Sequence, residues 1–191
     1  MTTAKYGVDR NEALTLLRAH LAGENMIKHC LAAEAVLRAM ARRLGEDEEQ
    51  WGLAGLLHDL DSESHPDLEV HTQETVRILT QRGVDPLIIE AIRLHNPTAH
   101  PGEQRSTPFH HALAAGETVT GLIIAAALVI PERKLGLVKV KSVRNRYKEK
   151  AFARGANREV IAECEQIGIP LAEFCELSLV AMQGIAAEIG L

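Results

Sequence analysis

Residues 112–130, ALAAGETVTGLIIAAALVI, form a nineteen-residue stretch in which Glu117 is the only charged side chain. Pro131 follows immediately and cannot continue a helix, so the pattern predicts a helix over roughly residues 109–129. A helix that is apolar on nearly all sides has to be buried over most of its surface. Its most apolar part, residues 121–130, is too short to span a bilayer, so we expect this helix inside a folded protein.

The overall composition also favours helices over strands. The chain has 191 residues, of which 46% are apolar, 25% charged and only 3% aromatic, which suits one compact domain with a real core. The N-terminal sequence MTTAKYGVDRNEAL has no apolar signal region, so a cytoplasmic protein is expected. Three cysteines without CxxC spacing, Cys30, Cys164 and Cys175, are typical of reduced, buried thiols.

Helix start and stop signals divide the chain into about nine segments with short connections and no internal repeat. Asp9 caps a first helix to about Leu21, and a second helix runs from Glu24 to Leu44, where Gly45 ends it. A third helix starts near Asp47. Further helices are expected over residues 67–82, 86–95, 109–129, 142–154, 157–168 and 170–191. We therefore predict an all-α, single-domain helical bundle of about eight to nine helices over residues 1–191.

The charge is distributed unevenly along the chain. Its net value of −5 provides no global basic field, so a nucleic-acid polymer is not an expected partner. Nevertheless, nine basic residues lie in one segment with Glu149 as its only acid: Arg133, Lys134, Lys139, Lys141, Arg144, Arg146, Lys148, Lys150 and Arg154. This segment is either a solvated helix face capped by Ser142, or a group that holds substrate phosphates, with Arg144 and Lys148 as the candidates.

His58 and Asp59 follow an apolar helical segment, WGLAGLL, so this polar pair is set against the core. A buried imidazole beside a buried carboxylate is a good fragment of a metal site, because a divalent cation can compensate both groups for lost hydration. The alternative is that the pair caps the helix end, where a histidine is favoured by the helix dipole.

Glu117 needs a partner if its helix is buried, because an isolated buried carboxylate is costly unless it is paired, protonated or bound to a cation. It could instead lie on one exposed stripe beside Thr118 and Thr120. His29, His71 and His95, the last followed by Asn96, each have a structural explanation when taken singly.

The order of these residues is more specific than any one of them. The order is His29, then His58 and Asp59 within LAGLLHDLD, then His71, then His95 with Asn96, and finally an acid in AGETVTGLI. This order resembles that of the HD-domain superfamily of metal-dependent phosphohydrolases. The resemblance covers residues 25–130, which would form the metal core. The sequence KVKSVRNRYKEKAFARGANREVI is similar to the tail of small stand-alone bacterial members, which implies a helical C-terminal extension over residues 140–191.

The resemblance implies a metal site with one or two divalent ions. It places His29, His58, Asp59 and Glu117 around one ion, with Asp59 bridging to a second ion bound by His71 and His95; Asp59, His71 and His95 are also the expected catalytic residues. Two ions would clamp a phosphate and activate a water. The mixed nitrogen and oxygen donors suit Mn, Fe, Co, Ni or Zn and do not exclude Mg.

The chain departs from similar members at the last ligand, because they carry an Asp in AADELTGLI where this chain has Glu117. Glu is one methylene longer, and Gly116 is expected to leave space for its reach. The expected substrate is a small phosphorylated metabolite, such as a nucleotide, hydrolysed as a phosphomonoester or phosphodiester. The alternatives are a non-catalytic module that binds a metal or a nucleotide, and a di-iron oxygenase.

The remaining features carry weaker expectations. His65, His100, His110 and His111 fall in or beside loops and are expected at the surface, and His20 is expected to be structural or exposed. The apolar C-terminal helix can pack either on its own core or on a second subunit, and we expect a homodimer; its apolar residues include Leu171, Phe174, Leu177 and Met182.

Overall fold

The computed structural model describes residues 4–191 and contains only helices, with no strand in that range. Ten α-helices are present: α1 (Arg10–His20), α2 (Glu24–Leu44), α3 (Glu48–Leu57), α4 (Gln73–Gln81), α5 (Pro86–His95), α6 (Pro108–Leu128), α7 (Val140–Lys148), α8 (Arg158–Ala162), α9 (Leu171–Gly184) and α10 (Ala186–Ile189). Three short 3₁₀ helices connect them: η1 (Pro97–Ala99), η2 (Leu135–Leu137) and η3 (Glu163–Ile167). The predicted all-α class is confirmed.

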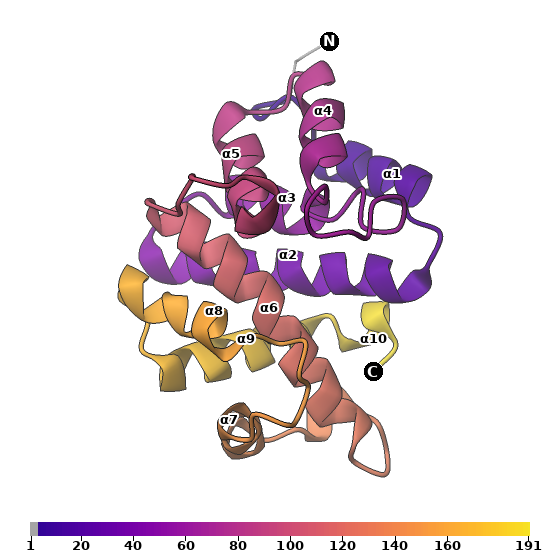
Figure 1. Cartoon of the computed structure of the whole chain (residues 1–191). Coiled ribbons are helices and arrows are strands. Elements are labelled where there is room, and N and C mark those ends of the chain that lie inside the picture. The colour runs from indigo at the N-terminus through magenta and orange to yellow at the C-terminus, as the bar shows by residue number, and fades with distance from the viewer. Residues whose placement is uncertain (1–3) are drawn as a thin grey trace.

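The two longest helices, α2 and α6, pack against each other at the centre of the molecule. Figure 1 shows α1 and α3–α5 on one side of α2, and α7–α10 on the other side. Most of the side chains of α6 are buried, which agrees with the apolar pattern of residues 112–130, and α2 buries about half of its residues. The three cysteines are buried and free, as the sequence predicts.

Local capping signals place several helix ends where the sequence predicts them. The Asp9 carboxylate accepts a hydrogen bond from the Glu12 backbone N–H, and the Glu12 carboxylate accepts one from the Asp9 N–H, both at 2.9 Å. Gly45 ends α2 in the left-handed region with a φ of 75°. Asp47 and Asp85 cap α3 and α5 through their side chains.

Glycine permits the closest helix contact in the core. A Cβ added at Gly55 of α3 would lie 2.8 Å from backbone atoms of Ala33 and Glu34 in α2. At Gly116 of α6 it would lie 2.5 Å from the end of the Leu37 side chain. Gly116 therefore allows α6 to approach α2, which corrects the expectation that it makes space for Glu117.

The helix predicted over residues 67–82 is wrong in its first part. Residues 58–72 form consecutive turns, and α4 starts only at Gln73, after Thr72 in the left-handed region with a φ of 86°. The Asp61 carboxylate accepts hydrogen bonds from the backbone N–H groups of Thr72 and Thr75 at 2.9 and 3.1 Å. A carboxylate distant in sequence thus satisfies the first N–H groups of α4 in place of a local cap.

The basic helix is shorter than predicted. It spans Val140–Lys148, and Lys139 instead of Ser142 occupies its N-cap position. The chain turns after Lys148 because the Arg158 guanidinium donates hydrogen bonds to backbone carbonyls that would otherwise accept from the N–H groups of a longer helix. These carbonyls belong to Arg146, Tyr147, Glu149, Phe152, Ala153 and Ala156.

The C-terminal segments also break earlier than predicted. Asn157 caps α8, so this helix starts close to the predicted position, but the chain continues as the 3₁₀ helix η3 from Glu163. The last predicted helix is interrupted at Ile185, which separates α9 from α10.

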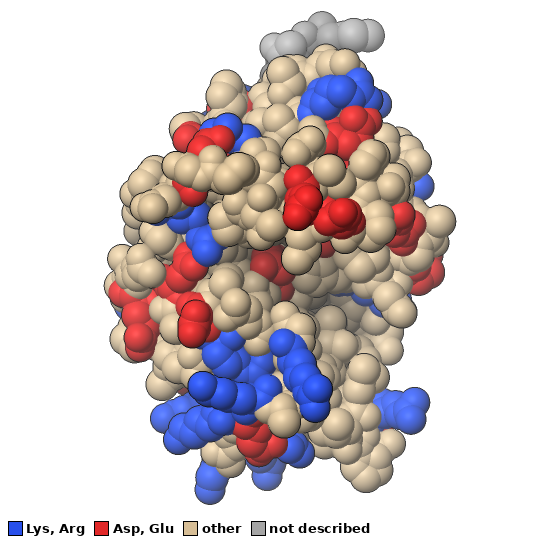
Figure 2. All heavy atoms as spheres, in the orientation of Figure 1, with Lys and Arg blue, Asp and Glu red and all other residues tan. Residues whose placement is uncertain are grey.

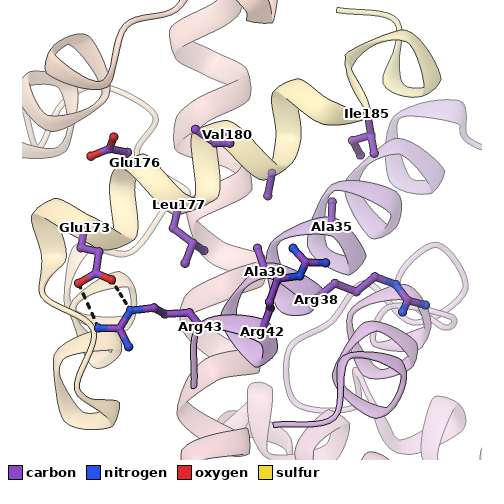
Figure 3. Close-up of a pocket in the computed structure, with 11 residues that line it drawn as sticks. Ala35, Arg38, Ala39, Arg42, Arg43, Glu173, Glu176, Leu177, Val180 and Ile185 are labelled. Carbon is purple, nitrogen blue, oxygen red and sulfur yellow. Dashed lines mark hydrogen bonds and ion pairs between the residues drawn. The ribbon is translucent and has the colours of Figure 1, made fainter. Parts of the chain in front are cut away.

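A groove of about 610 Å³ is lined by residues of α2 and α9, which pack against each other. Figure 3 shows Leu177 of α9 directed towards Ala39 of α2, with an ion pair between Arg43 and Glu173 at one end. Phe174 and Met182 are fully buried, so these two residues of α9 fill the core of their own chain. The homodimer stays a prediction.

The helix α6 has the length and composition of a membrane span, and it is the only single helix in the described part of the chain that does. However, 61% of its most apolar window is buried against neighbouring helices. This burial is the core packing that the sequence predicts for residues 112–130. The cytoplasmic location stays a prediction.

Candidate metal centre

Five of the six predicted metal ligands converge where four chain segments meet. His29 lies in α2, His58 caps the end of α3 and Asp59 follows it, His71 lies in the turns before α4, and His95 is the last residue of α5. Their donor atoms form two groups, His29–His58–Asp59 and Asp59–His71–His95, and within each group the atoms lie within 4.8 Å of one another. Asp59 is common to both groups.

Each carboxylate oxygen of Asp59 faces one pair of histidines. Its Oδ2 atom lies 3.5 Å from His58 Nε2 and 3.7 Å from His29 Nε2. Its Oδ1 atom lies 3.1 Å from His71 Nε2 and 3.5 Å from His95 Nε2. Asp59 is therefore placed to share its two oxygens between two cation positions.

All four histidines use Nδ1 for a second contact. The contact atoms and distances are Gly55 O for His58 (2.9 Å), Ile92 O for His95 (2.6 Å), Asp61 Oδ1 for His71 (2.8 Å) and Thr120 Oγ1 for His29 (2.9 Å). Because the Thr120 hydroxyl donates to the Glu117 carbonyl at 2.6 Å, it accepts from His29. All four rings thus donate from Nδ1, and Nε2 is left to bind a cation.

The Nε2 atoms approach each other closely in pairs. They are 3.1 Å apart between His29 and His58, and 3.3 Å apart between His71 and His95. When both nitrogens of a pair are unprotonated, they repel at this distance unless a cation lies between them. Two nitrogens about 2.1 Å from one ion at a right angle would be about 3.0 Å apart, so this donor set fits a divalent ion.

The charges around Asp59 also favour a cation. Burial would raise the pKa of Asp59, but the surrounding histidines outweigh burial and hold that pKa well below its usual range. Burial lowers the pKa of His58 to about 3, so its ring is neutral and its lone pair is available. Burial also disfavours a charge on His71, yet hydrogen bonds to Asp59 and Asp61 raise its pKa to about 9. A positive charge is therefore favoured between these two carboxylates.

Glu117, the sixth predicted ligand, lies at the edge of the site. Its Oε2 atom is 3.8 Å from His29 Nε2, and it belongs to neither donor group. Burial raises the pKa of Glu117. Its side chain is 19% exposed and Thr120 is fully buried, so these residues do not form an exposed stripe on α6.

Two residues that support the site were not predicted. Asp61 is fully buried and holds His71, while Thr120 holds His29. A signal for Asp61 was present, since it is a second carboxylate two positions after Asp59 in an apolar segment. Asn96 donates to the carbonyls of Leu68 and His71, and so ties the turns before α4 to the end of α5.

The substitution Asp61→Asn is expected to weaken metal binding by about 10–100-fold, because it removes the charge that orients His71. The measurement is a metal titration of the purified protein. Asp67→Asn, an exposed position in the same segment, is the control and should bind metal normally. Equal affinity for Asp61→Asn and the unaltered protein would show that Asp61 does not orient a ligand.

The predicted phosphate-binding residues do not join the histidines. Arg144 and Lys148 lie on the exposed side of α7, where they line a separate cavity of about 350 Å³ with Leu171 and Cys175. No hydrogen bond or ion pair within residues 4–191 connects them to the donor groups. Their role in substrate binding stays a prediction.

Three of the other histidines, His100, His110 and His111, have structural partners. The surface prediction is wrong for His110, which is buried at the start of α6 and accepts from the Ser106 N–H. His111 contacts the Glu163 carboxylate at 2.7 Å. His100 contacts the Thr72 hydroxyl at 2.8 Å.

Comparison with known proteins identifies one matching family model, the HD domain, over residues 26–128. The chain is 29% identical over 142 residues to ribonuclease Y of Bacillus subtilis (strain 168), and 27% identical over 153 residues to ribonuclease Y of Bacillus thuringiensis (strain Al Hakam). Each match covers 72% of this chain and 26% of the relative, so the chain spans about a quarter of their length. No solved structure matches.

Proposed function

We propose, since the chain belongs to the HD domain family, that it is a metal-dependent hydrolase of phosphate esters. The observation that carries this proposal is the pair of donor groups that share Asp59, with four Nε2 atoms turned towards it. Such an arrangement suits two ions on either side of one carboxylate.

The proposed first ion is held by His29, His58 and one oxygen of Asp59, with Glu117 as its outer ligand. The second is held by His71, His95 and the other oxygen of Asp59. When bound, the ions would lower the pKa of a water and offset the charge of a phosphate. Asp61 and Thr120 keep His71 and His29 oriented. The donor set suits Mn, Fe, Co, Ni, Zn or Mg, and it does not select one of them.

The proposed substrate is a small phosphorylated metabolite, such as a nucleotide. The relatives are named ribonucleases, which supports a substrate with phosphodiester bonds. Arg144 and Lys148 are proposed to hold substrate phosphates. Among the described residues neither has an ion-pair partner, which leaves both cations available for that role.

A non-catalytic metal-binding module is the second candidate, and the position of Glu117 favours it. This carboxylate stays outside both donor groups, whereas similar family members carry the shorter Asp there. A di-iron oxygenase has no such support.

Substitutions at Glu117 separate the two candidates. For a hydrolase, Glu117→Ala is expected to lower the hydrolysis of bis(p-nitrophenyl) phosphate by about 10–100-fold, because the outer ligand is lost, while Glu117→Asp keeps most activity. Glu176→Ala, an exposed glutamate on α9, is the control. A weak starting activity that rises strongly in Glu117→Asp would instead support a module that has lost its catalysis.

A further inference from the structure

One end of the molecule combines exposed apolar and basic side chains. We call residues 128–154 the tip; this segment runs from the end of α6 through η2 and α7. Seven large apolar side chains are well exposed in the described chain, and three of them lie in the tip: Leu128 (48%), Val129 (56%) and Leu137 (54%). The same segment carries nine Lys and Arg against two Glu. Figure 2 shows these cations gathered at the lower end of the molecule, where Figure 1 places α7.

The cations of the tip are mostly free of acidic partners. Among the ion pairs of residues 4–191, only Arg146 with Glu149 involves one of the nine. By contrast, the arginines in the rest of the chain are largely paired with glutamates, as at Arg10, Arg38, Arg42, Arg43, Arg77, Arg93 and Arg105. The positive charge of the tip is therefore available to an external partner.

The exposure of Leu137 follows from the contacts that hold the neighbouring residues in place. Leu135 and Val138 are buried on either side of Leu137, and Gln183 of α9 donates to the carbonyls of both. The Leu137 N–H donates to the Lys134 carbonyl at 3.1 Å, which closes the turn. Because its neighbours are anchored inward, Leu137 has to point outward.

Exposed leucine and valine in the same segment as unpaired lysines and arginines have the chemistry of a protein surface that lies on an anionic lipid layer. The apolar side chains enter the boundary of the acyl chains, and the cations of the tip other than the proposed substrate pair, Arg144 and Lys148, meet the headgroup phosphates. We propose that the tip docks on a membrane surface rich in anionic lipid. In this orientation the helices α3–α5 lie on the opposite side of α2 from α7 (Figure 1), and most of the proposed metal ligands lie in or between these three helices.

A nucleic acid would use the same cations but different neighbours. Single strands stack their bases on aromatic side chains, and the two aromatic residues of the tip are already engaged. The Arg146 guanidinium lies 4.6 Å from the centre of the Phe152 ring, and the Tyr147 hydroxyl donates to the Arg158 carbonyl. Exposed aliphatic side chains contribute nothing to the binding of a nucleic acid's phosphate backbone, whereas a lipid layer would bury them.

The test is cosedimentation of the full chain with phosphatidylcholine vesicles that contain or lack phosphatidylglycerol. Binding is expected only with phosphatidylglycerol. The double variant Val129→Ser with Leu137→Ser should lower the bound fraction at least tenfold. Its matched control is Leu87→Ser with Val180→Ser, which changes two equally exposed apolar side chains outside the tip (56% and 58%).

A charge pair completes the test. Lys139→Glu with Lys141→Glu should also abolish binding, whereas Arg18→Glu with Arg82→Glu, exposed and outside the tip, should retain it. Thermal melting checks that each variant is folded. The proposal is overturned if vesicles with phosphatidylglycerol do not bind the protein or if tip and control variants lose binding equally. It is also overturned if single-stranded oligouridylate binds in a way that needs the lysines but not Val129 and Leu137. None of these outcomes depends on hydrolytic activity.

Discussion

Replacement of Asp59 by alanine is expected to abolish both metal binding and hydrolysis. Asp59 is the only residue shared by the two donor groups, so its loss removes one ligand from each proposed ion. Metal ions stabilise a phosphoryl-transfer transition state by several kcal/mol, so the rate should fall by about a thousandfold. The measurements are elemental analysis of the purified protein and hydrolysis of bis(p-nitrophenyl) phosphate.

The same measurement distinguishes the possible kinds of site. About two ions per chain, lost in both Asp59→Ala and the double variant His58→Ala with Asp59→Ala, would support the dinuclear site. About one ion would leave His71 and His95 for the substrate. Glu69→Ala, an exposed acid in the same segment, should keep its metal. If the unaltered protein binds no metal even after reconstitution, the hydrolase proposal is wrong.

Gly55→Ala is expected to have the largest effect on stability. The new methyl group would lie 2.8 Å from the backbone of Ala33 and Glu34, and neither helix can move without disturbing the core. Overpacking costs about 1–3 kcal/mol, so unfolding free energy should fall by about 2 kcal/mol and the Tm by about 6 °C. Thermal melting of the metal-free protein measures this change.

Two other glycines test the explanation. At Gly116 the added methyl group meets the flexible ends of Leu37 and Met40, so Gly116→Ala should cost less. At Gly121, an exposed position of the same helix, nothing lies within 4 Å, and alanine should stabilise the helix slightly. If all three variants melted alike, close packing of α2 on α3 would not explain the effect.

The sequence predicts those helix ends that are set by neighbouring residues. Asp9, Gly45 and Asp85 act within one turn of their own helices, so local signals are sufficient there. The start of α4 and the end of α7 depend instead on distant side chains. Asp61 acts across 11 and 14 positions on Thr72 and Thr75, and Arg158 acts across up to 12 positions on the chain after α7.

The same distinction between local and distant contacts applies to the candidate site. The order of His29, His58, Asp59, His71 and His95 predicts that they meet because this order resembles that of the HD-domain superfamily, and not because of any one local pattern. The role of Thr120 depends on a contact across 91 positions, which no local pattern indicates, whereas Asp61 acts across 10 positions and its place two residues after Asp59 was a signal for it. Which residues Gly116 faces depends on how α6 crosses α2. This crossing is set only when the core assembles, so the sequence does not predict it.

The turns of residues 58–72 give the two halves of the site different conformational stability. His29 lies in a long buried helix, whereas His71 lies at the end of a segment with no helical hydrogen-bond ladder, held by Asp61 and Asn96. Exposed segments with few buried apolar contacts open locally without unfolding of the whole domain. The His71 half can therefore open by local unfolding while α2, α3 and α6 stay folded. Through this opening a small ligand could enter or leave the site without any movement of the core.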